Sequence, residues 1–151
     1  MKSIEKIALR FGVFTFLGLS AYFGLMMLFD IIHIIELRVL NAAIMFGGCF
    51  MAIRYARNHL GDFGYLQGMA VGSLTGIIAS ILFAGFGVIY LNFIDPEFML
   101  EIQQNELFGS YLNKVTANIQ IFMEGTGSAV VISLMIMQIY KPGLESNAGV
   151  N

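Results

Sequence analysis

The stretch GYLQGMAVGSLTGIIASILFA, residues 64–84, places a small side chain at every fourth position. Glycine inside a helix costs about 1 kcal/mol relative to alanine in water, so a soluble helix has little reason to repeat it. In lipid, helices associate through close backbone approach, and small residues four apart permit that approach. We therefore interpret six residues as a helix-packing ridge within a membrane bundle, and expect the ridge to wind across more than one neighbouring helix: Gly64, Gly68, Gly72, Gly76, Ser80 and Ala84.

The same spacing also suits a face that joins two copies of the chain, or a flexible gating helix. Small residues recur in other apolar segments, at Gly47 and Gly48 and again from Gly125 to Ala129. Because a GxxxG spacing alone is a weak signal of an oligomer, packing within one chain is the interpretation we favour.

Composition places the whole chain in the membrane. Of 151 residues, 58% are hydrophobic and 12% are charged, with a mean hydropathy of +0.78, whereas soluble domains are about 25% charged. Charge-free runs cover residues 11–29, 39–53, 63–94 and 125–140, and a spanning helix needs about 20 mostly apolar residues. The sequence predicts an all-α integral membrane protein, a four-transmembrane-helix bundle forming one domain over residues 1–141, with spans at about 8–30, 36–54, 63–93 and 116–140.

The basic residues predict the orientation of the bundle. Three precede the first span, Arg54 and Arg57 follow the second, and Lys141 follows the fourth, so six share one side, while Arg38 and Lys114 lie on the other. Basic residues accumulate on the cytoplasmic side of membrane proteins. We therefore expect both termini in the cytoplasm, with Arg54, Arg57 and Lys141 as topology anchors.

The connection between the third and fourth expected spans carries its own helix signal. Asp95 is a good N-cap and Pro96 suits the first helical position, and apolar residues recur on one face up to Tyr111. We predict a short amphipathic helix over about residues 96–110 in this outer loop. It serves either as a connector resting on the bundle or as an element for partner docking or gating.

After Lys141 the chain is polar, so we expect 142–151 to be a flexible cytoplasmic tail.

Catalytic signatures are missing from the sequence. It contains no GxSxG, Walker, CxxC or HExxH motif, and His33 and His59 fall on opposite sides of the expected membrane. The single Cys49 lies within an apolar run, where a thiol packs as a small hydrophobe. We therefore expect no catalytic residues, no metal and no cofactor.

The sequence has no basic tract, so we also expect no binding of nucleic acid. The expected partners are the lipid bilayer and either other membrane proteins or a second copy of the chain.

Glu124 is the acid inside a predicted span. It lies about 25 Å along a helix from Lys141, and Arg38 lies about 24 Å from Arg54. At nearly equal depth, Glu124 and Arg38 are expected to pair, with Asn41 and Gln120 as further partners. The alternative is a carboxylate that binds a proton or cation in a small oligomeric transporter, on a path lined by Asn41, Glu124, Ser128 and Ser133.

Three segments resemble a known family. They are AIRYARNHLGDFGYLQGMAVG at residues 52–72, IYLNFIDPEF at 89–98 and FMEGTG at 122–127. From about Phe11 to Tyr140 the chain resembles the small four-span bacterial proteins grouped as domain of unknown function 4199. The resemblance implies four membrane helices in a bacterial cytoplasmic membrane and supplies no activity. We favour a non-enzymatic structural or accessory component, with the transporter or channel as the alternative and a membrane enzyme third.

Overall fold

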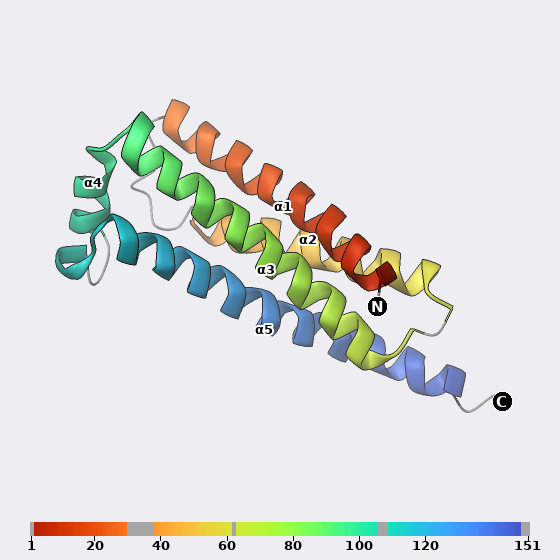
Figure 1. Ribbon diagram of the computed structural model, residues 1–151. Coiled ribbons are helices and arrows are strands. Elements are labelled where there is room, and N and C mark those ends of the chain that lie inside the picture. The colour runs from red at the N-terminus through yellow and green to blue at the C-terminus, as the bar shows by residue number, and fades with distance from the viewer. Residues whose placement is uncertain (1, 30–37, 62, 106–108, 149–151) are drawn as a thin grey trace.

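The computed structural model describes residues 2–29, 38–61, 63–105 and 109–148. All regular secondary structure in the described residues is helical, and these residues contain no β-strand (Figure 1). In chain order the elements are α1 (Lys2–Leu28), α2 (Arg38–His59), α3 (Tyr65–Ile89), the π-helical turn η2 (Tyr90–Ile94), α4 (Phe98–Asn105), the 3-10 turn η3 (Gly109–Tyr111) and α5 (Lys114–Ala148).

Within the described residues, four helical segments are long and apolar enough to cross a membrane: Ser3–Leu28, Val39–His59, Tyr65–Ile94 and Lys114–Lys141. The chain is a multi-pass membrane protein, and the predicted four-span helical bundle is confirmed. The start of α1 and the end of α5 lie at one end of the bundle and α4 lies at the other (Figure 1). We call these the terminal end and the α4 end.

Helix α3 is the central element. It packs against α1, α2 and α5, α1 also packs against α2, and α2 and α5 meet over a smaller area. The main core cluster lies among the four helices and includes Cys49, Ile53, Ala79 and Ile136, all fully buried. The Cys49 thiol donates a hydrogen bond of 3.5 Å to the Gly72 carbonyl oxygen, so this thiol lies inside the packed bundle.

The seam between α3 and α5 is built from small residues in antiparallel register. A Cβ at Gly72 would overlap Ser133, and one at Gly76 would overlap the Ala129 methyl group. Each step of four along α3 matches a step of four back along α5, because both helices repeat small residues at that spacing. The facing pairs are Gly68 with Met137, Gly72 with Ser133, Gly76 with Ala129, Ser80 with Gly125 and, further along, Gly87 with Asn118.

The ridge was expected to wind across more than one neighbouring helix, and its closest contacts are with α5. The ridge from Gly68 to Ser80 faces α5, with the α2 side chains of Ile53 and Met45 at its edge. Its two ends differ: nothing lies within 4 Å of a Cβ at Gly64, and Ala84 lines a groove between α3 and α5.

Hydroxyl groups at these contacts are satisfied within their own helices. Ser80 donates to the Gly76 carbonyl oxygen at 2.8 Å and Ser133 donates to the Ala129 carbonyl oxygen at 2.7 Å. Thr75 does the same with Val71 at 2.7 Å. Each of these hydroxyls therefore donates its hydrogen to the preceding turn of its own helix.

Helix α4 is shorter than the predicted 96–110 helix and begins at Phe98. The Phe98 amide donates to the Asp95 carboxylate at 3.2 Å, so Asp95 caps the helix as expected. Near its end a Cβ at Gly109 would overlap the backbone carbonyl of Gln103, and the chain turns there. The apolar face of α4 packs on the bundle end, with Met99 buried beside Leu91 and Ala117.

One aromatic ring ties α4 to helices that are distant in sequence. The Phe23 ring of α1 makes edge-on contacts with the rings of Phe83, Phe86, Tyr90 and Phe98, at centroid distances from 5.1 to 6.3 Å. The π-helical turn, closed by the Asp95 amide donating to the Tyr90 carbonyl oxygen at 2.9 Å, precedes α4. Phe23 is therefore the centre of an aromatic cluster at the α4 end.

α5 continues to Ala148, so part of the expected flexible tail has helical backbone, and its flexibility stays a prediction. Pro142 has no amide hydrogen to donate, so α5 has one intrahelical hydrogen bond fewer at this position. Residues 149–151 lie outside the described chain.

The seam generates a direct stability test. Gly76→Ala places a methyl group against the Ala129 methyl group, which has no rotamer to change, so the two backbones must separate. We expect a loss of about 1–3 kcal/mol, seen as a lower melting temperature in detergent. Gly47→Ala is the matched control, because nothing lies within 4 Å of a Cβ there. We expect this control to stay within about 1 kcal/mol of the wild type. Equal melting temperatures for both variants would contradict the close approach.

Candidate functional site

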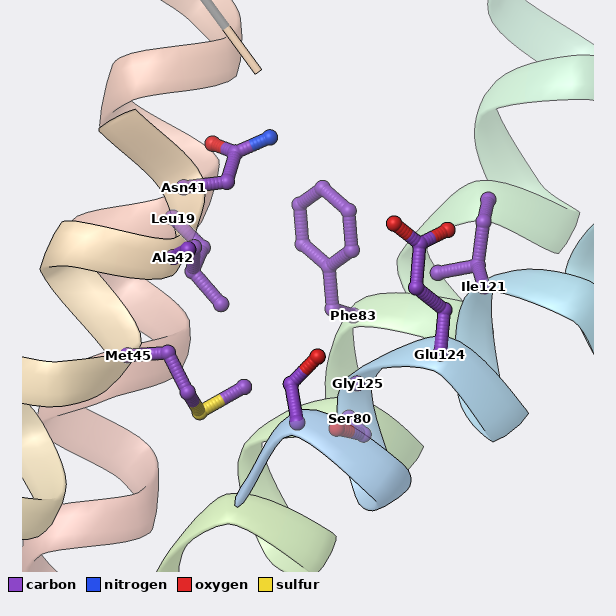
Figure 2. Close-up of a pocket in the computed structure, with 10 residues that line it drawn as sticks. Leu19, Asn41, Ala42, Met45, Ser80, Phe83, Ile121, Glu124 and Gly125 are labelled. Atoms are coloured by element: carbon purple, nitrogen blue, oxygen red, sulfur yellow. The ribbon is translucent and has the colours of Figure 1, made fainter. Parts of the chain in front are cut away.

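A cavity of about 140 Å³ lies in the half of the bundle nearer α4, between α2 and α5. Side chains from all four long helices line it, as Figure 2 shows. Its walls are largely apolar, whereas four of its residues carry polar side chains. The lining residues are Leu19, Asn41, Ala42, Met45, Ser80, Phe83, Ile121, Glu124, Gly125 and Ser128.

The seam explains how Glu124 comes to this cavity. Gly125 packs against Ser80, so the face of α5 that contains Ile121, Glu124 and Ser128 turns toward the gap beside α2. Figure 2 shows Asn41 on the α2 side and Glu124 on the α5 side, with the Phe83 ring from α3 between them. Polar groups from opposite walls therefore face one cavity.

The polar groups in the cavity include donors as well as acceptors, since the Asn41 amide nitrogen points toward the Glu124 side in Figure 2. The Ser80 hydroxyl uses its hydrogen for the Gly76 carbonyl oxygen. The Asn41 side-chain oxygen is buried and accepts no hydrogen bond from the described residues. Glu124 is exposed on the surface of an apolar span, where a carboxylate is costly unless it meets a donor.

The cavity is closed toward the terminal end. Ile53, Ile136 and Met137 are fully buried there. Ser133, which was expected on a transport path with Asn41, Glu124 and Ser128, is fully buried and donates to its own helix. The structure therefore groups Asn41, Glu124 and Ser128 at one cavity and places Ser133 in the packed seam.

The expected pair between Glu124 and Arg38 stays a prediction. The Arg38 side chain lies outside the described residues, although its backbone begins α2. Arg38 precedes Asn41 by one helical turn, so the two positions share a face of α2. Gln120 is not among the residues that line the cavity.

The residues expected to be topology anchors lie at the terminal end, and one of them joins two helices. The Arg57 guanidinium lies over the Tyr140 ring at 4.8 Å, and Phe50 stacks on that ring at 6.2 Å. Arg54 and Lys141 are exposed nearby in sequence. The contact of Arg57 with Tyr140 was missed at the sequence level, although both residues end their spans on the same side.

The described residues contain no cluster of three or more His, Cys, Asp or Glu side chains that could hold a metal ion. His33 lies outside them. The ring of His59 stacks on Tyr55, with 3.9 Å between centroids, and its Nδ1 lies 2.9 Å from the Tyr55 carbonyl oxygen.

Fold and cavity together define an all-helical, four-span membrane protein with a lateral intramembrane cavity. Residues 10–142 match the family described as Protein of unknown function (DUF4199). The chain belongs to this family, which confirms the resemblance seen in the sequence. Among curated proteins and solved structures, none matches this chain.

A charge exchange tests the expected pair. Glu124→Arg should lower the melting temperature in detergent, because it places two cations at one depth, and Arg38→Glu in the same chain should restore it. Each variant is compared with Gly47→Ala as a neutral reference. A double variant no more stable than Glu124→Arg alone would contradict the pairing. If Glu124→Gln keeps stability but removes a pH-dependent activity, the transporter interpretation gains instead.

Proposed function

We propose that this protein is a non-enzymatic accessory component of a bacterial cytoplasmic membrane, which binds a second membrane protein through the opening between α2 and α5. The observation that carries the proposal is the shape of the bundle. It is tightly joined along the α3–α5 seam and at the terminal end, but opens sideways near Asn41 and Glu124. An opening toward the lipid is accessible to a partner inside the membrane.

The surface beside the opening supports this proposal. Ala42 on α2 is exposed and lines the cavity. On α5, Gly127 shares a face with Glu124 and has nothing within 4 Å of a Cβ. Small residues on both sides let the backbone of another helix approach closely.

One feature argues against Ser80 as a nucleophile. Its hydroxyl is bonded to its own helix rather than to a base, whereas a catalytic hydroxyl needs a base within hydrogen-bond reach.

The proposed orientation has both termini in the cytoplasm and the α4 end outside. It rests on six basic residues against two across the membrane. The acids between Asp95 and Glu106 are consistent with this orientation, since acidic residues have little influence on it.

Cysteine labelling tests the orientation. A cysteine at Asn105 should react with an impermeant reagent in cells whose outer membrane is permeabilised, and a cysteine at Asn147 should react only after lysis. The native Cys49 is fully buried, so the parent protein serves as the unlabelled control. The reverse labelling pattern would overturn the orientation.

Photo-crosslinking in native membranes tests partner binding. A benzoylphenylalanine residue at Gly127 should give a discrete adduct with one membrane protein. The same residue at Gly47 is the control, because Gly47 also has open space around it but lies on a different face of the bundle. Adducts of equal yield from both positions, or from neither, would count against the proposed surface.

The second candidate is a small oligomeric transporter or channel. Its support is the grouping of Asn41, Glu124 and Ser128 at one intramembrane cavity. Because side chains fill the bundle below this cavity, a path across the membrane would have to be completed between copies of the chain.

A further inference from the structure

We propose that the groove between α3 and α5 at the α4 end binds one anionic phospholipid, with an acyl chain along the groove and the headgroup phosphate beside Lys114. This site is separate from the opening between α2 and α5, so the inference goes beyond the proposed function and does not depend on it. It follows from the depth of the groove, the charge at its mouth and its apolar length.

The groove lies at the depth of a single leaflet. Its volume is about 390 Å³, and it extends from Ala84 to Asn92 on α3 and from Lys114 to Phe122 on α5. On each helix this is a length of about 12 Å, and one leaflet contributes about half of a hydrocarbon core of about 30 Å. The groove therefore begins at the edge of the apolar span of α5 and covers most of one leaflet.

The mouth of the groove contains a cation. Lys114 is the first residue of α5 and lines the groove, and within the described ranges it forms no ion pair. The described acids of the neighbouring segment, Asp95, Glu97 and Glu101, do not line the groove. A lysine at the end of a span extends its ammonium group to the level of the headgroups, where it attracts anionic lipids.

The backbone amides at the start of α5 do not supply this charge. The Asn113 side-chain oxygen already accepts from the amides of Val115 and Thr116, at 2.9 Å each. Asn118 donates to the Lys114 carbonyl oxygen at 2.7 Å, and its own side-chain oxygen is buried. The attraction for an anion therefore comes from the Lys114 side chain.

Asn92 adds a polar group to the mouth. In the antiparallel seam Gly87 faces Asn118, so Asn92, further along α3, lies nearly level with Lys114, further back along α5. Asn92 is exposed and donates one amide hydrogen to the Val88 carbonyl oxygen at 2.7 Å, and the same nitrogen carries a second hydrogen. A phosphate has several acceptor oxygens and can therefore take donors from both the ammonium and the amide.

Below the mouth the groove is apolar and narrow. Ile119 and Phe122 line it on the α5 side, and exposed Gly85 has nothing within 4 Å of a Cβ on the α3 side. A helix is about 10 Å across, whereas α3 and α5 stay in contact along this stretch, at Gly87 and Asn118. The space fits a flexible chain of methylene groups rather than another helix.

The test uses purified full-length protein in detergent micelles, with bound lipids counted by native mass spectrometry. Phosphatidylglycerol and phosphatidylcholine with identical acyl chains are titrated separately, and soluble glycerol phosphate is the third ligand. We expect one phosphatidylglycerol to bind about fivefold more tightly than phosphatidylcholine, the effect of one lysine beside an anionic lipid. Glycerol phosphate should neither bind nor compete over the same concentrations, because it has no acyl chain to occupy the groove.

Matched variants identify the charge and the groove. Lys114→Gln should abolish the preference for phosphatidylglycerol and Lys114→Arg should keep it, while Lys6→Gln removes the same charge from an exposed position on α1 and should have no effect. Gly85→Leu fills the groove and should remove the bound lipid, whereas Gly47→Leu, at another open glycine, should retain it. Melting curves confirm that each variant is folded.

Three results would contradict the inference: equal binding of the two lipids, a preference that survives Lys114→Gln, or a lipid count that Gly85→Leu leaves unchanged. Displacement of phosphatidylglycerol by glycerol phosphate would also contradict it, because the site would then bind an anion without using the groove. Crosslinking at Gly127 tests the proposed partner site separately, so either proposal can fail while the other stands.

Discussion

The close approach of α3 and α5 determines where every other element of the bundle can lie. At Gly76 and Ala129 the two backbones come so near that one added methyl group would have no space. Lipid offers apolar side chains contacts comparable to those made by another helix, so association depends on how many atoms two helices bring together. Matching small residues over several turns maximise that number and make α3 the natural centre.

The cavity is a consequence of this preference. Since α5 follows α3 along its length, α2 meets α5 mainly near the terminal end, where Phe50 and Arg57 contact Tyr140. Toward α4, Met45 is the last α2 side chain to reach the α3–α5 seam, and beyond it lie Asn41 and Glu124. Close packing of α5 against α3 on one side thus leaves a gap between α5 and α2 on the other side, and polar residues line this gap.

Residue type and spacing predict the number of spans, the close packing of the ridge against other helices, and the cap at Asp95. They do not predict which helix the ridge packs against. A four-residue repeat defines a face of one helix, whereas the neighbour is decided by the matching repeat at Gly125, Ala129 and Ser133. The helical backbone outside the expected spans, at the start of α1 and the end of α5, has no such signal, because polar residues continue a helix beyond the hydrocarbon without any apolar pattern. The cavity could not be foreseen either: it depends on how far α2 diverges, and no local pattern encodes that distance.

The aromatic cluster around Phe23 also constrains the order in which the chain can assemble. Helices that cross a membrane can insert one at a time and associate afterwards. The ring of Phe98 contacts that of Phe23, a residue separated from it by most of three helices, and such long-range contacts form late because the intervening chain must be organised first. α4 can therefore make this aromatic contact only when α1 and α3 lie side by side, which couples the loop that holds α4 to the packing of the first and third spans.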